Sequence, residues 1–262
     1  MEGTVGNSMI TKIDIDNDAV VGRLGNKLFQ IATGYSIAKE MNDEFAIPAW
    51  KYAHVFPNVK MKQIVGFNKI WTEPSFTYSK PLIEHFSGTV QLNGYFQSDK
   101  YFSSREDIVK LFEFSTYVKS MACMYEQTNN LHISDYTAIH VRRGDYTNLT
   151  HYYADLASTE YYRNAIQLLG EKKFVVFSDD IGFCSQYFSQ FQGYDFHYVA
   201  GNNDHVDLCL MSNCKNNIIA NSSFSWWGAY LNQKNGKVVM PKDWFVCGLD
   251  SKDLYVDGWN KV

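Results

Sequence analysis

The chain has 262 residues, of which 45% are hydrophobic, 16% aromatic and 20% charged, and its formal net charge is −4. This composition is typical of a folded globular protein and excludes an intrinsically disordered one. The negative net charge gives no reason to expect a nucleic-acid partner. The length suffices for one large α/β domain or for two compact lobes.

Five cysteines occur without a CxxC pair, and their odd number favours reduced thiols over a disulfide framework. No run approaches the roughly 18–20 apolar residues that span a bilayer, and the first residues do not resemble a signal peptide. We therefore expect no transmembrane segment and a cytoplasmic location. The first eight residues, which are small and polar ahead of Met9, are assigned no function.

In the first half of the chain, a short strand is expected around Met9–Ile15, where apolar and polar residues alternate. After a polar turn, Gly22-Arg23-Leu24-Gly25-Asn26 leads into a helix that extends to Met41, because apolar side chains recur there at helical spacing. Ser103 with Glu106 predicts a capping box that opens a second helix.

The second half alternates regularly between strands and helices. Strands are expected at Thr137–Val141, Phe174–Ser178, Asn217–Ala220 and Lys237–Met240, and helices at Tyr161–Leu169, at Asp204–Cys214 and after Asn221. Such alternation implies parallel sheets joined by right-handed crossovers. The segment Phe112–Asp135 is expected to separate two lobes, residues 1–130 and residues 131–262.

Two arginines follow the strand at Thr137–Val141. In an open α/β sheet, ligands bind beyond the carboxyl ends of the strands, which is where His140, Arg142 and Arg143 are expected. A guanidinium presents several donors in a rigid fork that matches phosphate oxygens. An ion pair of either arginine with Asp145 is the alternative that this loop leaves open.

Two further turns offer hydrogen-bond donors. Ser222 and Ser223 open an expected helix, where hydroxyls and free backbone N–H groups suit an anion, although simple N-capping by either serine is the alternative. The turn from Gly22 to Asn26 is neither a GxGxxG fingerprint nor a Walker loop. Its glycines permit close backbone approach, and Arg23 and Asn26 add side-chain donors.

Asp207 lies on an expected helix and is a candidate for base recognition. A carboxylate that faces guanine accepts two hydrogen bonds, from N1 and N2, which adenine cannot supply. An exposed helix carboxylate is the alternative. The acidic groups around Asp14 and around Asp204 lack the spacing of an EF-hand or of another recognised metal site, so no metal is expected.

Five segments resemble, in chain order, the motifs of the bacterial inverting α-1,2-fucosyltransferases, glycosyltransferase family 11. HVRRGDY is similar to a loop shared by α-1,2-, α-1,6- and protein O-fucosyltransferases, whereas NSSFSWWGA is similar to the C-terminal motif of the α-1,2 group. Lys27 departs from the family, which usually has Gln there. The segments are Gly22–Gln30 (GRLGNKLFQ), Leu92–Ser98 (LNGYFQS), His140–Tyr146 (HVRRGDY), Phe177–Asp180 (FSDD) and Asn221–Ala229 (NSSFSWWGA).

The resemblance implies a GT-B-like α/β fold, in which two Rossmann-like lobes turn their parallel sheets toward a central cleft. Residues 1–130 would form the acceptor side and residues 131–262 would bind GDP-L-fucose. The acceptor would be a galactose-terminated oligosaccharide of a surface polysaccharide. The resemblance also implies no metal or other cofactor, and a bacterial enzyme located in the cytoplasm or at the inner membrane face.

The same resemblance assigns individual roles. Arg142 would hold the β-phosphate and act in catalysis, and His140 and Asp207 would read guanine. Arg23 and Asn26 would approach the diphosphate and the fucose from the other lobe. Further substrate contacts would come from Arg143, Ser222, Ser223 and Phe224. The general base is not assigned, although Asp145, His151 and Asp155 are candidates because they are close in sequence.

Three other functions stay open on the sequence. A fucosyltransferase of another linkage would share HVRRGDY, and a non-catalytic sugar- or nucleotide-binding module would need the aromatic residues without converging arginines. The tripeptide Arg143-Gly144-Asp145 matches an integrin-type adhesion signal, but so short a match arises easily by chance. The sequence specifies neither the acceptor glycan nor the oligomeric state.

Overall fold

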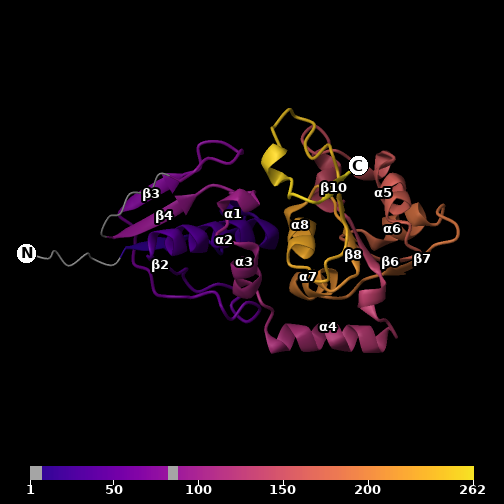
Figure 1. Ribbon diagram of the computed structural model, residues 1–262, viewed down its shortest axis with the longest axis horizontal. Helices are drawn as coiled ribbons and strands as arrows, with labels where there is room; N and C mark the ends of the chain where they lie inside the picture. Colours follow the sequence, from indigo (N-terminus) through magenta and orange to yellow (C-terminus); the bar gives the residue numbers. More distant parts are fainter. Residues whose placement is uncertain (1–7, 82–87) are drawn as a thin grey trace, which may run out of the picture. The chain divides into compact units, whose positions relative to one another are not determined.

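The computed structural model describes residues 8–81 and 88–262, so all but one of the first eight residues lie outside the described part. The chain forms two compact units (Figure 1). The first unit comprises Met1–Ser115 and Asp250–Val256, and the second comprises Thr116–Leu249 and Asp257–Val262. Each unit is described by itself below.

The first unit is built on a four-stranded parallel sheet with the strand order β2-β1-β4-β3. The strands are β1 (Met9–Thr11), β2 (Glu44–Phe45), β3 (Lys69–Thr72) and β4 (Thr89–Asn93). The first strand is shorter than predicted. The chain turns after Thr11 because the buried Lys12 ammonium pairs with the Asp14 carboxylate at 2.6 Å.

Helix α2 (Leu24–Met41) of the first unit has the bounds that the sequence predicts. The first unit also contains the short helices α1 (Asp18–Val21) and α3 (Arg105–Leu111) and the 3-10 turns η1 (Asp99–Tyr101) and η5 (Lys252–Leu254). The predicted capping box is wrong by one residue. Ser104, not Ser103, caps α3 by accepting from the Asp107 N–H at 3.1 Å.

The second unit is built on a six-stranded parallel sheet with the order β10-β9-β8-β5-β6-β7. The predicted strand Thr137–Val141 is confirmed to the residue as β5, and the other three predicted strands are confirmed to within two residues at each end. The strands are β5 (Thr137–Val141), β6 (Lys173–Ser178), β7 (Asp195–Tyr198), β8 (Asn216–Ile218), β9 (Val238–Met240) and β10 (Asn260–Lys261).

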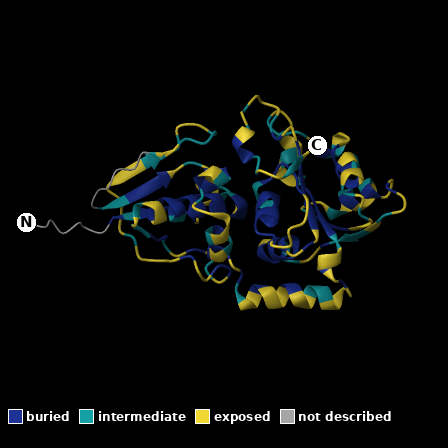
Figure 2. Cartoon of the chain, viewed as in Figure 1, coloured by how far each residue is buried: buried dark blue, intermediate teal, exposed yellow. Residues whose placement is uncertain are grey.

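Helices of the second unit differ in how deeply they are buried. Figure 2 shows α7 and α8 mostly buried, whereas α4 is exposed along most of its length. The side chains of Trp226 and Trp227 in α8 are both fully buried. The helices are α4 (Thr116–Thr128), α5 (Tyr161–Leu169), α6 (Ile181–Phe188), α7 (Asp204–Ser212) and α8 (Ser223–Tyr230), and the 3-10 turns are η2 (Ile133–Asp135), η3 (Gly144–Asn148) and η4 (Leu156–Ser158).

The strand order reverses once in each sheet. In the first unit β2 lies on one side of β1 and β4 on the other, and in the second unit β6 lies on one side of β5 and β8 on the other. At such a reversal the connections leave toward opposite faces, and a crevice opens beyond the carboxyl ends of the two strands. The strand orders therefore predict a place for a ligand beyond the carboxyl ends of β1/β4 and of β5/β8.

The division into units differs from the expected boundary between residues 130 and 131. The units change over between Ser115 and Thr116 because α4 packs on α7 and so belongs to the second unit. Near the C-terminus, residues 250–256 return to the first unit, where Lys100 forms an ion pair with the Asp253 carboxylate and the Tyr78 N–H donates to it at 2.8 Å.

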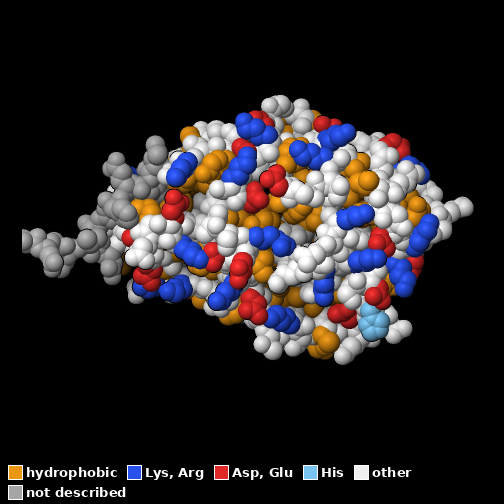
Figure 3. Space-filling model, viewed as in Figure 1, with side chains coloured by type: hydrophobic (Ala, Val, Ile, Leu, Met, Phe, Trp, Pro, Cys, Tyr) orange, Lys and Arg blue, Asp and Glu red, His pale blue; other side chains and the backbone are white. Residues whose placement is uncertain are grey.

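Charges of both signs are interspersed on the visible face of the molecule (Figure 3). That pattern suits a folded protein whose net charge is only −4. Among residues 8–81 and 88–262, no helix is both long enough and apolar enough to cross a membrane.

Two helical glycines predict opposite effects on stability. A Cβ on Gly34 of α2 would overlap the ring of the buried Phe45, whereas a Cβ on Gly182 of α6 would meet nothing closer than Asp180 Oδ1 at 3.8 Å. We expect Gly34→Ala to destabilise the fold by about 1–3 kcal/mol through overpacking. Gly182→Ala should stabilise it by up to about 1 kcal/mol because alanine is the better helix former.

Differential scanning calorimetry of the two variants beside the parent protein checks this pair. An equal or higher Tm for Gly34→Ala would contradict the close approach of α2 to β2.

Candidate functional site

Arg142 lies in the loop after β5, between two carboxylates. Its Nη1 donates to Asp179 Oδ2 at 2.6 Å, and its Nη2 forms an ion pair with Asp145. Only 12% of the Arg142 side chain is exposed, against 52% for Asp145. The ion pair with Asp145, which the sequence left open as the alternative, is therefore present. Arg142 also forms an ion pair with Asp179.

Asp179 is the residue at this edge that sequence reasoning missed. It follows β6, and its second oxygen accepts from the backbone N–H of Arg143 at 2.9 Å. A Cβ on Gly144, whose φ is 25°, would overlap the Asp179 carboxylate. One carboxylate thus fixes the loop after β5 to the loop after β6. The FSDD resemblance was the signal that could have placed it here.

Arg143 is anchored separately from its neighbour. Its guanidinium lies 3.9 Å from the centre of the Phe183 ring and 3.5 Å from Asp155. Arg142 in turn lies 5.1 Å from the Tyr146 ring, which stacks on Tyr153 with the ring centres 3.8 Å apart. Burial raises the pKa of Tyr146 well above its usual range, so this ring stays neutral.

His140, at the end of β5, is 5% exposed. Burial lowers the pKa of its imidazole to about 4, against an opposing effect of the Asp179 charge, so the ring is neutral at pH 7. Nδ1 of His140 is buried and has no hydrogen-bond partner among the described residues. The ring lies 5.6 Å from that of Phe224 in the first turn of α8. An unpaired buried polar atom is costly, and a ligand that bonds to it removes that cost.

Asp207 lies in the first turn of α7. Burial raises the pKa of its carboxyl to about 6, and a hydrogen bond from the Asn202 amide at 3.0 Å opposes that rise. An exposed helix carboxylate, the alternative left open by the sequence, would not have a raised pKa. The structure places this acid in a half-buried position instead.

The turn after β8 carries Ser222, Ser223 and Phe224. Ser222 is the N-cap residue of α8, yet its side chain makes no capping hydrogen bond, and it is only 6% exposed. The neighbouring Asn221 amide donates to the backbone oxygens of Ala154 at 2.9 Å and Trp244 at 3.1 Å. Simple capping by Ser222 is therefore not found, and the turn is held in place by Asn221.

The second unit thus brings most of its predicted site residues to one edge of the sheet. His140 and Arg142 follow β5, and Ser222 and Phe224 follow the adjacent β8, so they flank the place where the strand order reverses. Asp207 comes from α7, which packs on α8. This edge therefore combines the neutral imidazole of His140, the Asp207 carboxyl with its raised pKa, and the Arg142 guanidinium, which Asp179 holds in place.

In the first unit, Arg23 is the exposed N-cap residue of α2, and Asn26 lies one turn further along. The Asn26 side chain accepts through Oδ1 from the Gln97 amide at 2.8 Å. Gly22 has a φ of 79°, and a Cβ there would overlap the Asn26 amide nitrogen. The first turn of α2 and the turn after β4 are therefore joined by a side-chain hydrogen bond.

The acidic residues that precede this turn are paired with lysines. Lys27, which is fully buried, lies 2.8 Å from Asp18 and 3.6 Å from Asp16, and Lys51 lies 2.8 Å from Asp18. These pairs lower the pKa of Asp18. Across the described parts of the chain, no group of three or more His, Cys, Asp or Glu side chains is arranged to hold a metal ion.

The three candidates for a general base have different surroundings. Asp145 and Asp155 form ion pairs with Arg142 and Arg143 respectively, and His151 is exposed. The structure singles out none of them, and their role stays a prediction.

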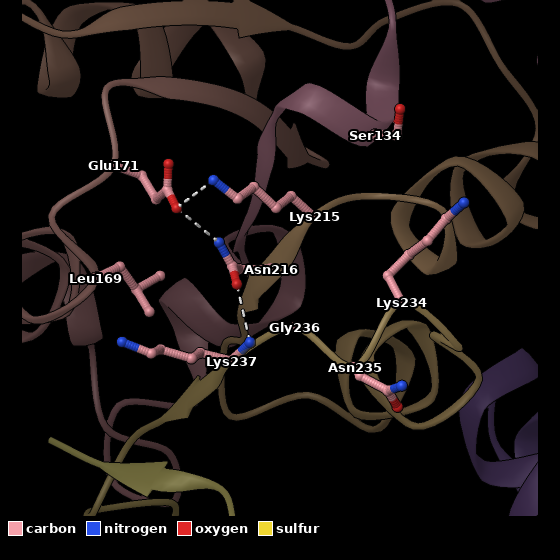
Figure 4. A pocket seen from close by; sticks show the side chains of 9 residues that line it. All are labelled: Ser134, Leu169, Glu171, Lys215, Asn216, Lys234, Asn235, Gly236 and Lys237. Carbon is pink, nitrogen blue, oxygen red and sulfur yellow. Dashed lines mark hydrogen bonds and ion pairs between the residues drawn. The ribbon is translucent and has the colours of Figure 1, made fainter.

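A pocket of about 490 Å³ lies at the opposite, amino-terminal edge of the second sheet, where β8 and β9 begin. Lys215, which pairs with Glu171 at 2.8 Å, lines it together with Lys234 and Lys237. Figure 4 shows the three lysine side chains leading in different directions, so they do not converge on one anion. None of the predicted site residues lines this pocket.

Comparisons with known proteins agree with this architecture. The alpha-1,2-colitosyltransferase of Escherichia coli is 31% identical to this chain over 93% of it and 97% of the relative. The O-antigen biosynthesis glycosyltransferase WbnK of Escherichia coli is 35% identical, over 64% of this chain and 59% of the relative. The galactoside alpha-(1,2)-fucosyltransferase 2 of Bos taurus is 25% identical, over 80% of this chain and 67% of the relative.

Solved structures of low identity share the fold. The crystal structure of POFUT1 in complex with GDP has a TM-score of 0.56 at 12% identity and covers 89% of this chain and 97% of its own. Fucosyltransferase NodZ from Bradyrhizobium has a TM-score of 0.51 at 12% identity, with coverages of 85% and 91%. These likenesses, together with the two parallel sheets, confirm the predicted GT-B-type α/β fold.

The family described as Glycosyl transferase family 11 matches residues 7–262, which is nearly the whole chain. The predicted family resemblance is therefore confirmed, and the chain belongs to glycosyltransferase family 11.

Proposed function

We propose that this glycosyltransferase transfers L-fucose from GDP-β-L-fucose to the 2-hydroxyl of a terminal galactose, giving an α-1,2 linkage with inversion. The observation that carries the proposal is the neutral, buried His140, whose Nδ1 has no described partner at the reversal of the second sheet. A ligand that bonds to this nitrogen satisfies an atom that the folded chain leaves unsatisfied. A purine base that packs beside Phe224 has the shape and the polar edge to do so.

Guanine fits the second polar group of this site. An ionised Asp207 carboxylate accepts hydrogen bonds from N1–H and from the N2 amine of guanine. Adenine presents no donor at N1 and uracil has no exocyclic amine. The half-buried position strengthens this discrimination because a mismatched base would leave the carboxylate desolvated and unpaired.

The diphosphate is assigned to Arg142 and to the start of α8. As the bond between fucose C1 and the β-phosphate oxygen breaks, negative charge builds on the departing GDP. Arg142 is held by Asp179 within the folded chain, so little reorganisation is needed when that charge develops. The exposed Asp145 is the partner that a phosphate would displace. In this proposal, fixed donors supply the charge stabilisation, and no metal takes part.

The remaining assignments complete an in-line displacement. The acceptor 2-hydroxyl attacks C1 from the face opposite GDP and passes its proton to a general base, which is not assigned. The bond from C1 to the β-phosphate oxygen breaks as GDP leaves, and inversion turns the β-linked donor into an α-linked product. Arg23 and Asn26 are proposed to contact the diphosphate and the fucose, and Ser222, Ser223 and Arg143 to add contacts to the donor. The bacterial cytoplasm, or the inner membrane face, is the proposed location.

The linkage and the sugar rest on the relatives. Both the bacterial relative named alpha-1,2-colitosyltransferase and the bovine galactoside alpha-(1,2)-fucosyltransferase support an α-1,2 linkage. Colitose is L-fucose without its 3-hydroxyl, so transfer of colitose is a second candidate function, favoured by the 31% identity to that relative. A direct competition between GDP-fucose and GDP-colitose over a galactoside acceptor decides between the two sugars.

Isothermal titration with GDP, ADP and UDP in the presence of EDTA tests the nucleotide site. We expect GDP to bind, with ADP and UDP at least about tenfold weaker, because only guanine pairs with Asp207. Equal affinities for the three nucleotides, or binding of GDP only after a divalent ion is added, would refute the assignment.

Replacing Arg142 with Ala is expected to lower kcat by about 10²–10³-fold, because it removes a donor aimed at the leaving phosphate. Arg163→Ala is the matched control: Arg163 is 43% exposed on α5, where it pairs with Glu160. Initial rates with saturating GDP-fucose give the comparison. If Arg142→Ala transferred fucose as fast as the control, the phosphate role would be lost.

The raised pKa of the Asp207 carboxyl predicts how GDP affinity depends on pH. Because its carboxyl has a pKa of about 6 and must be ionised to accept from guanine, GDP affinity should fall as the pH drops below about 6. Asp207→Asn should remove this part of the pH dependence together with the preference for GDP. The phosphates of GDP titrate as well, so the measured quantity is the difference between the two proteins.

The same variant should be more stable in the absence of nucleotide. A raised pKa means that the native state loses stability as the pH rises from about 4 to 6. The uncharged amide introduced by Asp207→Asn would avoid this loss, worth about 1–3 kcal/mol at pH 7. Chemical unfolding of both proteins at pH 7 checks the sign. A less stable Asp207→Asn protein would indicate a structural carboxylate instead.

A further inference from the structure

The bond between Asn26 and Gln97 lies across the reversal of strand order in the first unit. Asn26 lies in the first turn of α2, the helix that follows β1 and α1 in the chain, and Gln97 lies in the turn after β4, which is the neighbour of β1. Gln97 is 8% exposed, and its Nε2 donates to Asn26 Oδ1 at 2.8 Å. A side chain buried in this way has few alternative rotamers, so it fixes the group to which it bonds.

The direction of this hydrogen bond determines which end of the Asn26 amide is available. With the oxygen accepting from Gln97, the NH2 end lies beside Gly22, where a Cβ would overlap it. Glycine leaves that side of the turn open. An anionic group that approaches the turn therefore meets an N–H donor and not a carbonyl oxygen.

The turn that carries Gln97 is held by the half-buried carboxylate of Glu73. Glu73, directly after β3, accepts through Oε2 from the backbone N–H of Tyr95 at 2.9 Å and of Phe96 at 3.0 Å, and through Oε1 from the Tyr101 hydroxyl at 3.1 Å. Desolvation raises the pKa of Glu73, and the two backbone hydrogen bonds oppose the rise. Two adjacent backbone N–H groups on one oxygen form a small anion nest.

The nest also holds an unfavourable backbone conformation. Phe96 has a φ of 54°, although it is not glycine, and its buried ring stacks on Trp71 with the centres 5.6 Å apart. Such a backbone conformation is unfavourable for a residue other than glycine and persists where its surroundings determine it. Gly94 has a φ of 154°, and a Cβ there would meet Glu73 at 2.5 Å. The backbone of Gln97 is thus set by Glu73.

We propose that Gln97 is a positioning residue, which orients the Asn26 amide with its NH2 toward the donor sugar diphosphate, and that Glu73 holds the turn that carries Gln97. This inference rests on the proposed function, in which Asn26 contacts the donor. The inference adds Glu73, which follows β3, and Gln97, which follows β4, to the part of the site in the first unit. Without them, that part would consist only of the residues around the start of α2.

A double-mutant cycle tests the link between Gln97 and Asn26. Gln97→Ala should lower kcat by about tenfold to a hundredfold, because a misplaced group near the reacting atoms has an effect of this size. Asn26→Ala should lower kcat at least as much, and adding Gln97→Ala to it should cause no further loss. The affinity for GDP should fall much less than kcat in Gln97→Ala, because Arg142 and Asp207 keep their proposed contacts with the nucleotide.

Gln97→Glu tests the orientation itself. A carboxylate at this position can only accept, so Asn26 would have to reverse its amide and present its oxygen to the donor. We expect a larger loss of kcat than in Gln97→Ala, and a displaced signal of the Asn26 side-chain NH2 in NMR spectra. Gln186→Glu, on an exposed face of α6, is the matched control for the added charge.

Glu73→Gln tests the anchoring of the turn. An amide cannot accept from all three donors, so the turn should loosen, and kcat should fall much more than the affinity for GDP. Full additivity of Gln97→Ala and Asn26→Ala, or an unmoved Asn26 NH2 signal in Gln97→Glu, would overturn the positioning role. Absence of both transfer and GDP binding in the unchanged protein would instead overturn the proposed function, and the NMR comparison would still decide the orientation.

Discussion

In both sheets the chain leaves a central strand toward one side and later comes back to the other side of that strand. This reversal, at β1/β4 and at β5/β8, places loops from distant parts of the sequence next to each other at the carboxyl edge. Arg142 and Phe224 are 82 residues apart, and Asn26 and Gln97 are 71 residues apart, as the residue numbers show. The position of every candidate side chain depends on this constraint.

Carboxylates fix several of the loops near these edges in place. Asp179 holds Arg142 and the Arg143 backbone, Glu73 holds the turn of Gln97, and Asp253 ties residues 250–256 to Lys100 and Tyr78. A half-buried carboxylate accepts several hydrogen bonds at once, so it can fix a loop that has no regular structure. An active site built on loops gains rigidity in this way without longer strands or helices.

The sequence predicted the fold where a pattern was long or flanked by clear signals. The apolar face of α2 gave its bounds to the residue, and the buried strand Thr137–Val141 was confirmed as β5. Strand β3 was missed because its residues are mostly exposed, and β10 has only two residues, so neither carries a strand pattern. Helix α4 was not predicted and lies within Phe112–Asp135, the segment expected to separate the lobes. Only Val118 and Ala122 of this helix are buried, so its sequence carries little apolar helical pattern.

The sequence predicted the side chains that can donate hydrogen bonds to a phosphate, but not the side chains that hold them in place. Arg142 and Ser222 stand out because a guanidinium or a helix N-terminus suits phosphate by itself. Asp179 and Gln97 act only through a partner, and that partnership exists because strand order brings their loops together. A single sequence contains no such information about strand order. Roles that depend on one side chain are therefore visible in the sequence, whereas roles that depend on a pair require the topology.

Each unit has a support of the same kind at the carboxyl edge of its sheet, and this has a chemical reason. In the second unit Asp179 after β6 fixes a guanidinium after β5, and in the first unit Gln97 after β4 fixes an amide after β1. Loss of a nucleotide diphosphate creates charge that must be met by donors already in place, because donors that reorient during the reaction contribute less. The neutral Gln97 amide holds the neutral Asn26 amide, and the negative Asp179 carboxylate holds the positive Arg142 guanidinium. The charge of each supporting group therefore suits the group that it holds. In each unit the fold thus supplies the orientation of the side chain to which the proposed function assigns the donor.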